Sequence, residues 1–102
     1  GYSRGGRGAY EYAAAEPHRI RTLAVISARD MPDLIPRISA LPLFICHGTR
    51  DQRTPIENIR RMHESFTSCG GDSPLAIVEG DHFIIAKVLS EGRVFKWQRD
   101  AI

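Results

Sequence analysis

Cysteine is scarce in this sequence, and its two cysteines, Cys46 and Cys69, lie outside any C-x-x-C pattern. The chain is therefore not a disulfide-dense small domain, and nothing in it predicts a zinc or redox motif. Histidines at metal-binding spacing such as H-x-x-x-H are also missing, so we expect no metal and no cofactor. Two free thiols fit a reducing compartment, which favours the cytoplasm.

An excess of one charge is missing too, because 14 basic side chains face 12 acidic ones and the formal net charge is only +2. All basic residues except Lys87 and Lys96 are arginines, and they are scattered among carboxylates. Nucleic-acid-binding proteins usually gather basic residues on one face, so we expect a mixed, solvated surface and no nucleic-acid partner. Unbroken apolar runs stay below about seven residues, whereas a membrane-spanning helix needs about 20, so no membrane span is expected.

Short apolar runs alternate with amphipathic stretches along the 102 residues, a length that suffices for one domain at most. Continuous, mostly aliphatic runs predict buried strands over residues 22–27, 43–46 and 75–78. Helices are predicted over residues 4–16, 55–69 and 84–98. The segment 28–41 contains Pro32 and Pro36 and is predicted mostly as loop. Strands buried on both faces and joined by helices indicate an α/β protein with a parallel sheet.

The helix predicted from residue 55 has the clearest start and stop signals in the chain. Thr54 is its expected N-cap, Pro55 its first residue and Glu57 the partner in a capping box. Gly70 is expected to end it. The last helix is expected to break at Gly92, and its expected apolar side consists of Ile85, Val88, Leu89 and Phe95.

Residues 1–5, Gly-Tyr-Ser-Arg-Gly, form a G-x-S-x-G pattern directly before the first predicted helix. In that arrangement a sharp strand-to-helix turn presents the serine at its apex in a strained backbone conformation. Glycines two before and two after Ser3 are expected to remove Cβ clashes in the turn. The Arg4 backbone N–H would point at an oxygen that becomes negative in acyl transfer, aided by the helix dipole. The alternative is a glycine-rich turn with an incidental serine.

An acid and a histidine follow the serine at the ends of the next predicted strands. Asp51 comes shortly after the strand 43–46, and His82 comes shortly after the strand 75–78. Function in α/β proteins gathers at the carboxyl ends of the strands, so both side chains are expected at one edge of the sheet. Asp81 is the rival acid, but adjacent side chains at a strand end usually diverge, which favours Asp51. The order Ser, Asp, His is the one expected of α/β hydrolases.

The chain resembles the C-terminal half of an α/β-hydrolase-fold serine hydrolase. It is similar to the dienelactone-hydrolase, polyhydroxybutyrate-depolymerase-like and prolyl-oligopeptidase-like esterases, and the resemblance covers nearly the whole chain. These families often have glycine directly before the histidine, where this sequence has Asp81. The residues that carry the resemblance are Gly1-Tyr2-Ser3-Arg4-Gly5-Gly6, Gly8, His47-Gly48-x-x-Asp51, Thr54-Pro55 and His82.

The resemblance implies a sheet of eight strands, of which the last three would be present here. We therefore expect residues 1–102 to be a single partial domain that starts at the nucleophile elbow. The strand before Ser3 and a second oxyanion donor would lie in the absent N-terminal half. The predicted strand 22–27 also has no visible partner on its outer side, and natural proteins avoid such unpaired apolar edges.

These observations predict a serine hydrolase that cleaves a carboxylic ester through an acyl-enzyme. Ser3 would attack the acyl carbonyl, His82 would transfer its proton, Asp51 would orient the imidazole, and Arg4 would supply one oxyanion N–H. His47 is expected to brace the acid loop. The expected partner is a small-molecule ester or acyl substrate, and the oligomeric state stays open. The alternatives are a serine peptidase of the same fold and a truncated fragment, and we expect this chain alone to be inactive.

Overall fold

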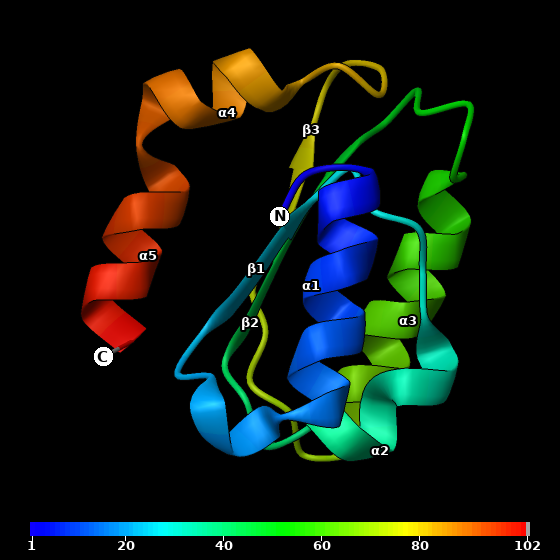
Figure 1. Ribbon diagram of the computed structural model, residues 1–102. Helices are drawn as coiled ribbons and strands as arrows, with labels where there is room; N and C mark the ends of the chain where they lie inside the picture. Colours follow the sequence, from blue (N-terminus) through cyan, green and yellow to red (C-terminus); the bar gives the residue numbers. More distant parts are fainter. Residues whose placement is uncertain (102) are drawn as a thin grey trace.

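A computed structural model describes residues 1–101, whose path Figure 1 follows from the blue N-terminus to the red C-terminus. Within these residues the sheet has three parallel strands in the order β1-β2-β3. They are β1 (Leu23–Ile26), β2 (Leu43–Gly48) and β3 (Leu75–Val78). Parallel neighbours need crossover connections, and both connections here contain helical turns. The predicted parallel sheet of an α/β protein is confirmed.

Helices cover both faces of the sheet. Figure 1 shows α1 and α3 beside each other on one side of the strands and α4 and α5 on the other. The longer helices are α1 (Arg4–Ala15), α3 (Ile56–Ser68), α4 (Ile85–Glu91) and α5 (Arg93–Ala101). The short helical turns are η1 (Pro17–Arg19), η2 (Pro32–Leu34) and α2 (Ile35–Ile38). In the part of the chain that is described, no helix has the length and apolar character needed to traverse a bilayer.

Two hydrophobic cores form, one on each face, because successive side chains of a strand point to opposite faces of the sheet. On one face Val25 and Ile45 pack with the apolar sides of α1, α2 and α3. On the other face Phe44 and Val78 pack with Val88 of α4. Every residue of the central strand β2 is buried, so this strand fixes the position of the loop that follows it.

The prediction of a mostly looped segment over residues 28–41 is wrong for residues 32–38, which are helical, and holds for the residues on either side. Pro32 begins the turn η2, and Pro36 lies in the first turn of α2. Proline is compatible with the first turn of a helix, because the N–H that it lacks would have no partner there. Ile35 and Ile38 are buried against α1, which anchors this segment over the core.

The predicted capping box of α3 is wrong. The cap residue is Pro55, with φ −59° and ψ 143°, and no side chain caps the helix. Two hydrogen bonds of its backbone hold Thr54 instead. Its N–H donates to Asp51, and its carbonyl accepts from His47. The predicted stop is correct, since Gly70 follows α3 with φ +83°.

The C-terminal helices break at Gly92, as predicted, and this residue adopts a left-handed conformation with φ +68°. Their predicted apolar side is partly wrong, since the side chains of Leu89 and Phe95 are 44% and 54% exposed. Val88 and Val94 are buried in the core, and Ile85 and Trp97 pack against it while partly exposed. Gly92 interrupts the helix, so helical spacing counted across it does not predict which face of α5 is buried.

The outer edge of β1 pairs with the first residues of the chain. Tyr2 forms a parallel bridge with Ile26, and the Ile26 N–H donates to the Gly1 carbonyl at 2.9 Å. Beyond this short pairing lies an apolar groove of about 450 Å³ between β1, α1 and the C-terminal helices. Tyr12 and Phe95 are two of the exposed aromatic side chains that line it.

Candidate active site

Ser3 lies in a sharp turn between the edge of β1 and the first residue of α1. Its N–H donates to the Ile26 carbonyl at 2.9 Å, which fixes the turn to the carboxyl end of β1. The backbone of Ser3 has φ 55° and ψ −119°. A positive φ is rare outside glycine and stores about 1–3 kcal/mol, which the surrounding structure must hold in place. This strained conformation is the one that the G-x-S-x-G pattern predicts for its serine.

Two glycines are required by close packing in this turn, but only one of them is a glycine of the motif. A Cβ on Gly1 would lie 2.2 Å from the Gly5 carbonyl oxygen, and a Cβ on Gly6 would lie 2.6 Å from the Ala28 Cβ. A Cβ on Gly5 would meet nothing within 4 Å. The expected role of Gly5 in relieving a clash is therefore wrong, and Gly6 has that role because α1 crosses Ala28 closely there.

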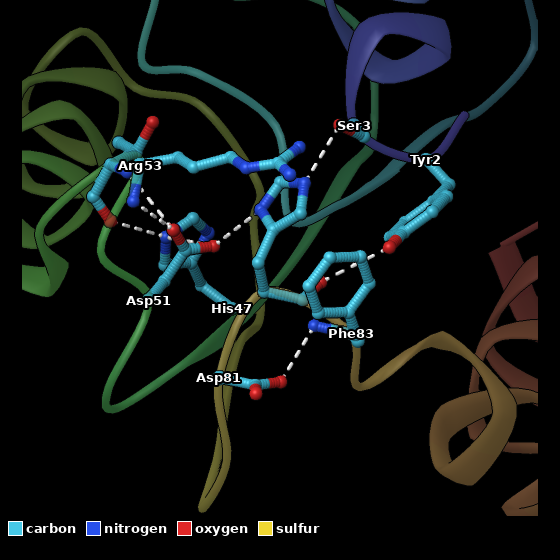
Figure 2. A network of polar contacts seen from close by, with 9 residues as sticks. Tyr2, Ser3, His47, Asp51, Arg53, Asp81 and Phe83 are labelled. Carbon is cyan, nitrogen blue, oxygen red and sulfur yellow. Dashed lines mark hydrogen bonds and ion pairs between the residues drawn. The ribbon is translucent and has the colours of Figure 1, made fainter.

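Ser3, His82 and Asp51 form one chain of hydrogen bonds (Figure 2). The Ser3 Oγ lies 2.8 Å from the Nε2 of His82, and the Nδ1 of His82 lies 2.9 Å from the Oδ2 of Asp51. A carboxylate can only accept, so Nδ1 carries the imidazole proton and Nε2 accepts from the serine hydroxyl. His82 and Asp51 are both 6% exposed. The structure thus brings these three residues together in the order that acyl-transfer chemistry requires.

The carboxylate of Asp51 is held from its other side by the backbone of its own loop. Its Oδ1 accepts the N–H groups of Arg53 at 2.8 Å and Thr54 at 3.0 Å. Burial opposes ionisation of this carboxyl, but these hydrogen bonds and the one from His82 outweigh it and lower the pKa of Asp51. Asp51 is therefore a charged, oriented acceptor for the histidine.

The acid loop (residues 48–54) and the histidine loop (residues 79–83) touch through their backbones. A Cβ on Gly48 would lie 2.4 Å from the Asp81 carbonyl oxygen, so only glycine fits between β2 and the loop after β3. The Arg50 N–H donates to the Gly80 carbonyl at 2.8 Å, which closes the contact. Through this contact the two loops fix the separation between Asp51 and His82.

His47 lies beneath the acid loop and is completely buried. Its Nε2–H donates to the Thr54 carbonyl at 2.8 Å and lies 3.5 Å from the Oδ2 of Asp51, in agreement with the expected bracing role. Its Nδ1 is buried and makes no hydrogen bond with any residue in the described range. Asp81, the rival acid, is exposed and accepts the Phe83 N–H at 2.8 Å. Its carboxylate thus caps its own turn.

Reasoning from the sequence missed a hydrogen bond from Tyr2 and a set of cationic side chains around the serine. The Tyr2 hydroxyl donates to the His82 carbonyl at 3.2 Å and ties the histidine loop to the turn of Ser3. A cavity of about 460 Å³ reaches Ser3 and His82, and we call it the arginine cavity because four arginines line it. They are Arg4, Arg7, Arg29 and Arg53. Arg4, Arg29 and Arg53 come within three residues after Ser3, the end of β1 and Asp51, and these points meet at one sheet edge. That placement was a partial signal, although it does not show that the side chains converge.

Searches of known proteins found fold relatives but no family assignment. No family model matches the chain. A non-reducing polyketide synthase of Emericella nidulans is 43% identical over 37 residues, which are 36% of this chain and 2% of that protein. A variant of Arabidopsis thaliana SOBER1 superposes with a TM-score of 0.75 at 22% identity, and Zea mays acyl-protein thioesterase 2 superposes with a TM-score of 0.75 at 18% identity. A thermostable esterase gives a TM-score of 0.66 at 23% identity.

These likenesses establish the fold. The SOBER1 and thioesterase alignments cover 99% of this chain but only 51% and 54% of those proteins, and the thermostable esterase alignment covers 85% and 23%. The chain therefore has an α/β-hydrolase fold and spans about half the length of the SOBER1 and thioesterase structures.

Proposed function

We propose that this chain carries the nucleophile, base and acid of a serine hydrolase that cleaves carboxylic esters through an acyl-enzyme. The observation that carries the proposal is the hydrogen-bonded chain from Ser3 through His82 to Asp51, with the serine in a strained turn before a helix. A serine with an incidental role has no need of an imidazole at 2.8 Å whose other nitrogen is bound to a buried carboxylate. The fold relatives, which include esterases and a thioesterase, support the same reaction class.

The reaction follows from the positions of the atoms. As the Ser3 Oγ bonds to the acyl carbon, its proton passes to the Nε2 of His82, and Asp51 stabilises the imidazolium that forms. The former carbonyl oxygen becomes negative and takes a hydrogen bond from the Arg4 N–H, which has no earlier turn of α1 to bond. The ester C–O bond then breaks, and His82 gives the proton to the leaving alkoxide. Water repeats the sequence on the acyl-enzyme and releases the acid.

We propose further that residues 1–102 are the C-terminal part of a larger α/β-hydrolase domain. The chain spans about half of the SOBER1 and thioesterase structures, which supports this division. The parallel pairing of Tyr2 with Ile26 and the apolar groove beside β1 also fit a sheet that continues past this edge. A second oxyanion donor would come from that other part, so a 102-residue fragment without it is the inactive alternative.

Thioester cleavage is the second candidate for the same site. The fold relatives include an acyl-protein thioesterase, which supports this candidate. The steps at Ser3, His82 and Asp51 are the same, with a thiolate as the leaving group. A serine peptidase would differ in its leaving group, an amine that His82 would protonate. Among the described residues around the site, none favours a peptide over an ester.

A fluorophosphonate probe tests the proposed function, because it forms an Oγ–P bond and expels fluoride only at an activated serine. In the whole gene product we expect labelling at Ser3 alone, read by mass spectrometry of the labelled peptide. Ser3→Ala should abolish labelling and lower ester turnover by about 10⁶, and His82→Ala should match it within about tenfold. Ser65→Ala, on the exposed side of α3, is the matched control and should change neither. Labelling that survives Ser3→Ala would refute the assignment.

A further inference from the structure

The arginine cavity has an uneven distribution of charge. Arg4, Arg7, Arg29 and Arg53 line it together with Ser3 and His82, and no carboxylate is among its lining residues within positions 1–101. Arginines scattered along the sequence thus converge in space on the proposed nucleophile. Figure 2 shows the Arg53 side chain extending across the hydrogen-bond network toward Ser3.

Most of this positive charge is not neutralised by the protein. Arg7 pairs with Glu11 at 3.1 Å, one turn along α1. Over residues 1–101, Arg4, Arg29 and Arg53 make no ion pair, although Arg53 lies 5.4 Å from the centre of the Phe83 ring. Clefts lined by one sign of charge attract counter-charged ligands, and guanidinium groups bind carboxylate or phosphate in a forked geometry.

A buried hydroxyl at the same cavity gives a second, independent observation. Ser27 is 1% exposed, lines the arginine cavity and has an Oγ with no hydrogen-bond partner among the described residues. Its backbone has φ 54°, a strained conformation for serine. Buried polar groups are normally paired, so an unpaired hydroxyl beside a cavity is placed to bond a ligand.

We propose that the substrate of this site carries an anionic group, a carboxylate or a phosphate, a few bonds from the carbonyl that Ser3 attacks. The arginines would hold this group, and the hydroxyl of Ser27 would donate to it or to the chain beside it. The inference rests on the proposed function, because it takes Ser3 as the acyl acceptor, and it adds the class of substrate.

The neighbouring surface is less favourable for an anion. A larger cavity of about 830 Å³ shares Arg7, Arg29 and Arg53 but is also lined by Asp30 and Asp33. Two carboxylates offset part of the arginine charge in that larger cavity. The arginine cavity beside Ser3 has no carboxylate in its lining, so it is the better place for an anion.

Paired esters that differ only in charge test the proposal in the whole gene product. We compare 4-nitrophenyl hydrogen adipate with 4-nitrophenyl methyl adipate, and 4-nitrophenyl 4-phosphonobutyrate with its dimethyl ester. At 50 mM salt kcat/KM should favour the anionic member by about tenfold or more, as a few charge-assisted contacts provide. The preference should fall at 500 mM salt, where exposed charges are screened beyond a few ångströms. If only one pair shows the preference, that pair identifies the anion: a carboxylate for the adipates, or a phosphate for the phosphonobutyrates.

Substitutions separate a local site from a general effect of charge. The double variant Arg29→Gln with Arg53→Gln should reduce the preference for the anionic ester to about threefold or less. Arg29→Lys with Arg53→Lys should retain part of the preference, because lysine keeps the charge but lacks the forked guanidinium. Arg37→Gln with Arg60→Gln, on exposed positions of α2 and α3, removes the same charge outside the cavity and should leave the preference unchanged. An equal loss in this control pair would overturn the proposal.

A binding measurement keeps this proposal separate from the proposed function. In the Ser3→Ala gene product, saturation-transfer NMR should detect monomethyl adipate but not dimethyl adipate, and the signal should weaken with Arg29→Gln and Arg53→Gln. If neither ester is hydrolysed but this selective binding is found, the hydrolase proposal fails and the anion site stands. If both esters are hydrolysed at Ser3 at equal rates and binding is not selective, the hydrolase proposal stands and the anion site is refuted.

Discussion

Gly6→Ala is the substitution in the serine turn whose effect the structure predicts most sharply. The added Cβ would lie 2.6 Å from the Ala28 Cβ, whereas ordinary contacts begin at 3.4 Å. The first turn of α1 would therefore have to retreat from β1 by roughly 0.8 Å, and overpacking of this kind costs about 1–3 kcal/mol. Ser3 lies at the start of that helix, so the same movement would separate its Oγ from His82. A misplacement near 1 Å can lower a catalysed rate by about 10²-fold.

Gly5→Ala is the matched control, because its Cβ would meet nothing within 4 Å although Gly5 belongs to the sequence motif. It should leave stability unchanged or raise it slightly, since alanine favours a helix over glycine by about 0.5–1 kcal/mol. Urea denaturation of the whole gene product gives the stabilities, and the rate of fluorophosphonate labelling reports the position of Ser3. If Gly5→Ala harms both and Gly6→Ala harms neither, the packing argument for this turn is refuted.

Further predictions concern the acid and the thiols. Asp51→Asn should lower kcat by about 10⁴, the scale seen when a triad imidazole loses its carboxylate, and Asp81→Asn should cost far less; steady-state ester hydrolysis by the two variants decides between the acids. Because folding lowers the pKa of Asp51, its contribution to stability is present above pH 3.8 and is lost as the pH falls through the folded value. Asp51→Asn should therefore flatten the acid side of a stability profile measured by urea denaturation. Burial raises the pKa of the Cys46 thiol to about 11, so iodoacetamide at pH 8 should label the exposed Cys69 first, as peptide mapping would show.

The strands were predictable because parallel strands covered by helices leave short, continuous apolar runs, although alternate residues of β3 are only half-buried. Leu43 to Cys46 and Leu75 to Val78 were found at nearly their observed bounds for this reason. The order of Ser3, Asp51 and His82 along these elements also predicted their approach, since parallel strands bring their carboxyl ends to one edge. Local start signals were less reliable: Thr54 resembles an N-cap, yet tertiary hydrogen bonds to Asp51 and His47 determine its position.

Features that depend on distances between elements could not be read from the sequence. The role of Gly6 follows from how closely α1 crosses Ala28, and no pattern within residues 1–6 encodes that crossing. The arginine cavity has the same origin, because Arg29 and Arg53 are distant in sequence and meet only when β1 and β2 end side by side. Composition alone had suggested evenly solvated cations.

The backbone contact at Gly48 has a consequence for how such a site can be altered. The acid loop and the histidine loop meet at Gly48, whose Cα has room for a hydrogen but not for a Cβ. The Arg50 N–H donates to the Gly80 carbonyl across this contact. Neither loop can be lengthened, shortened or exchanged with one from another protein without displacing the other. Engineering by recombination should therefore inherit residues 48–83 from one parent, with crossover points before β2 ends or after the histidine loop, because a crossover inside α3 would take the two loops from different parents.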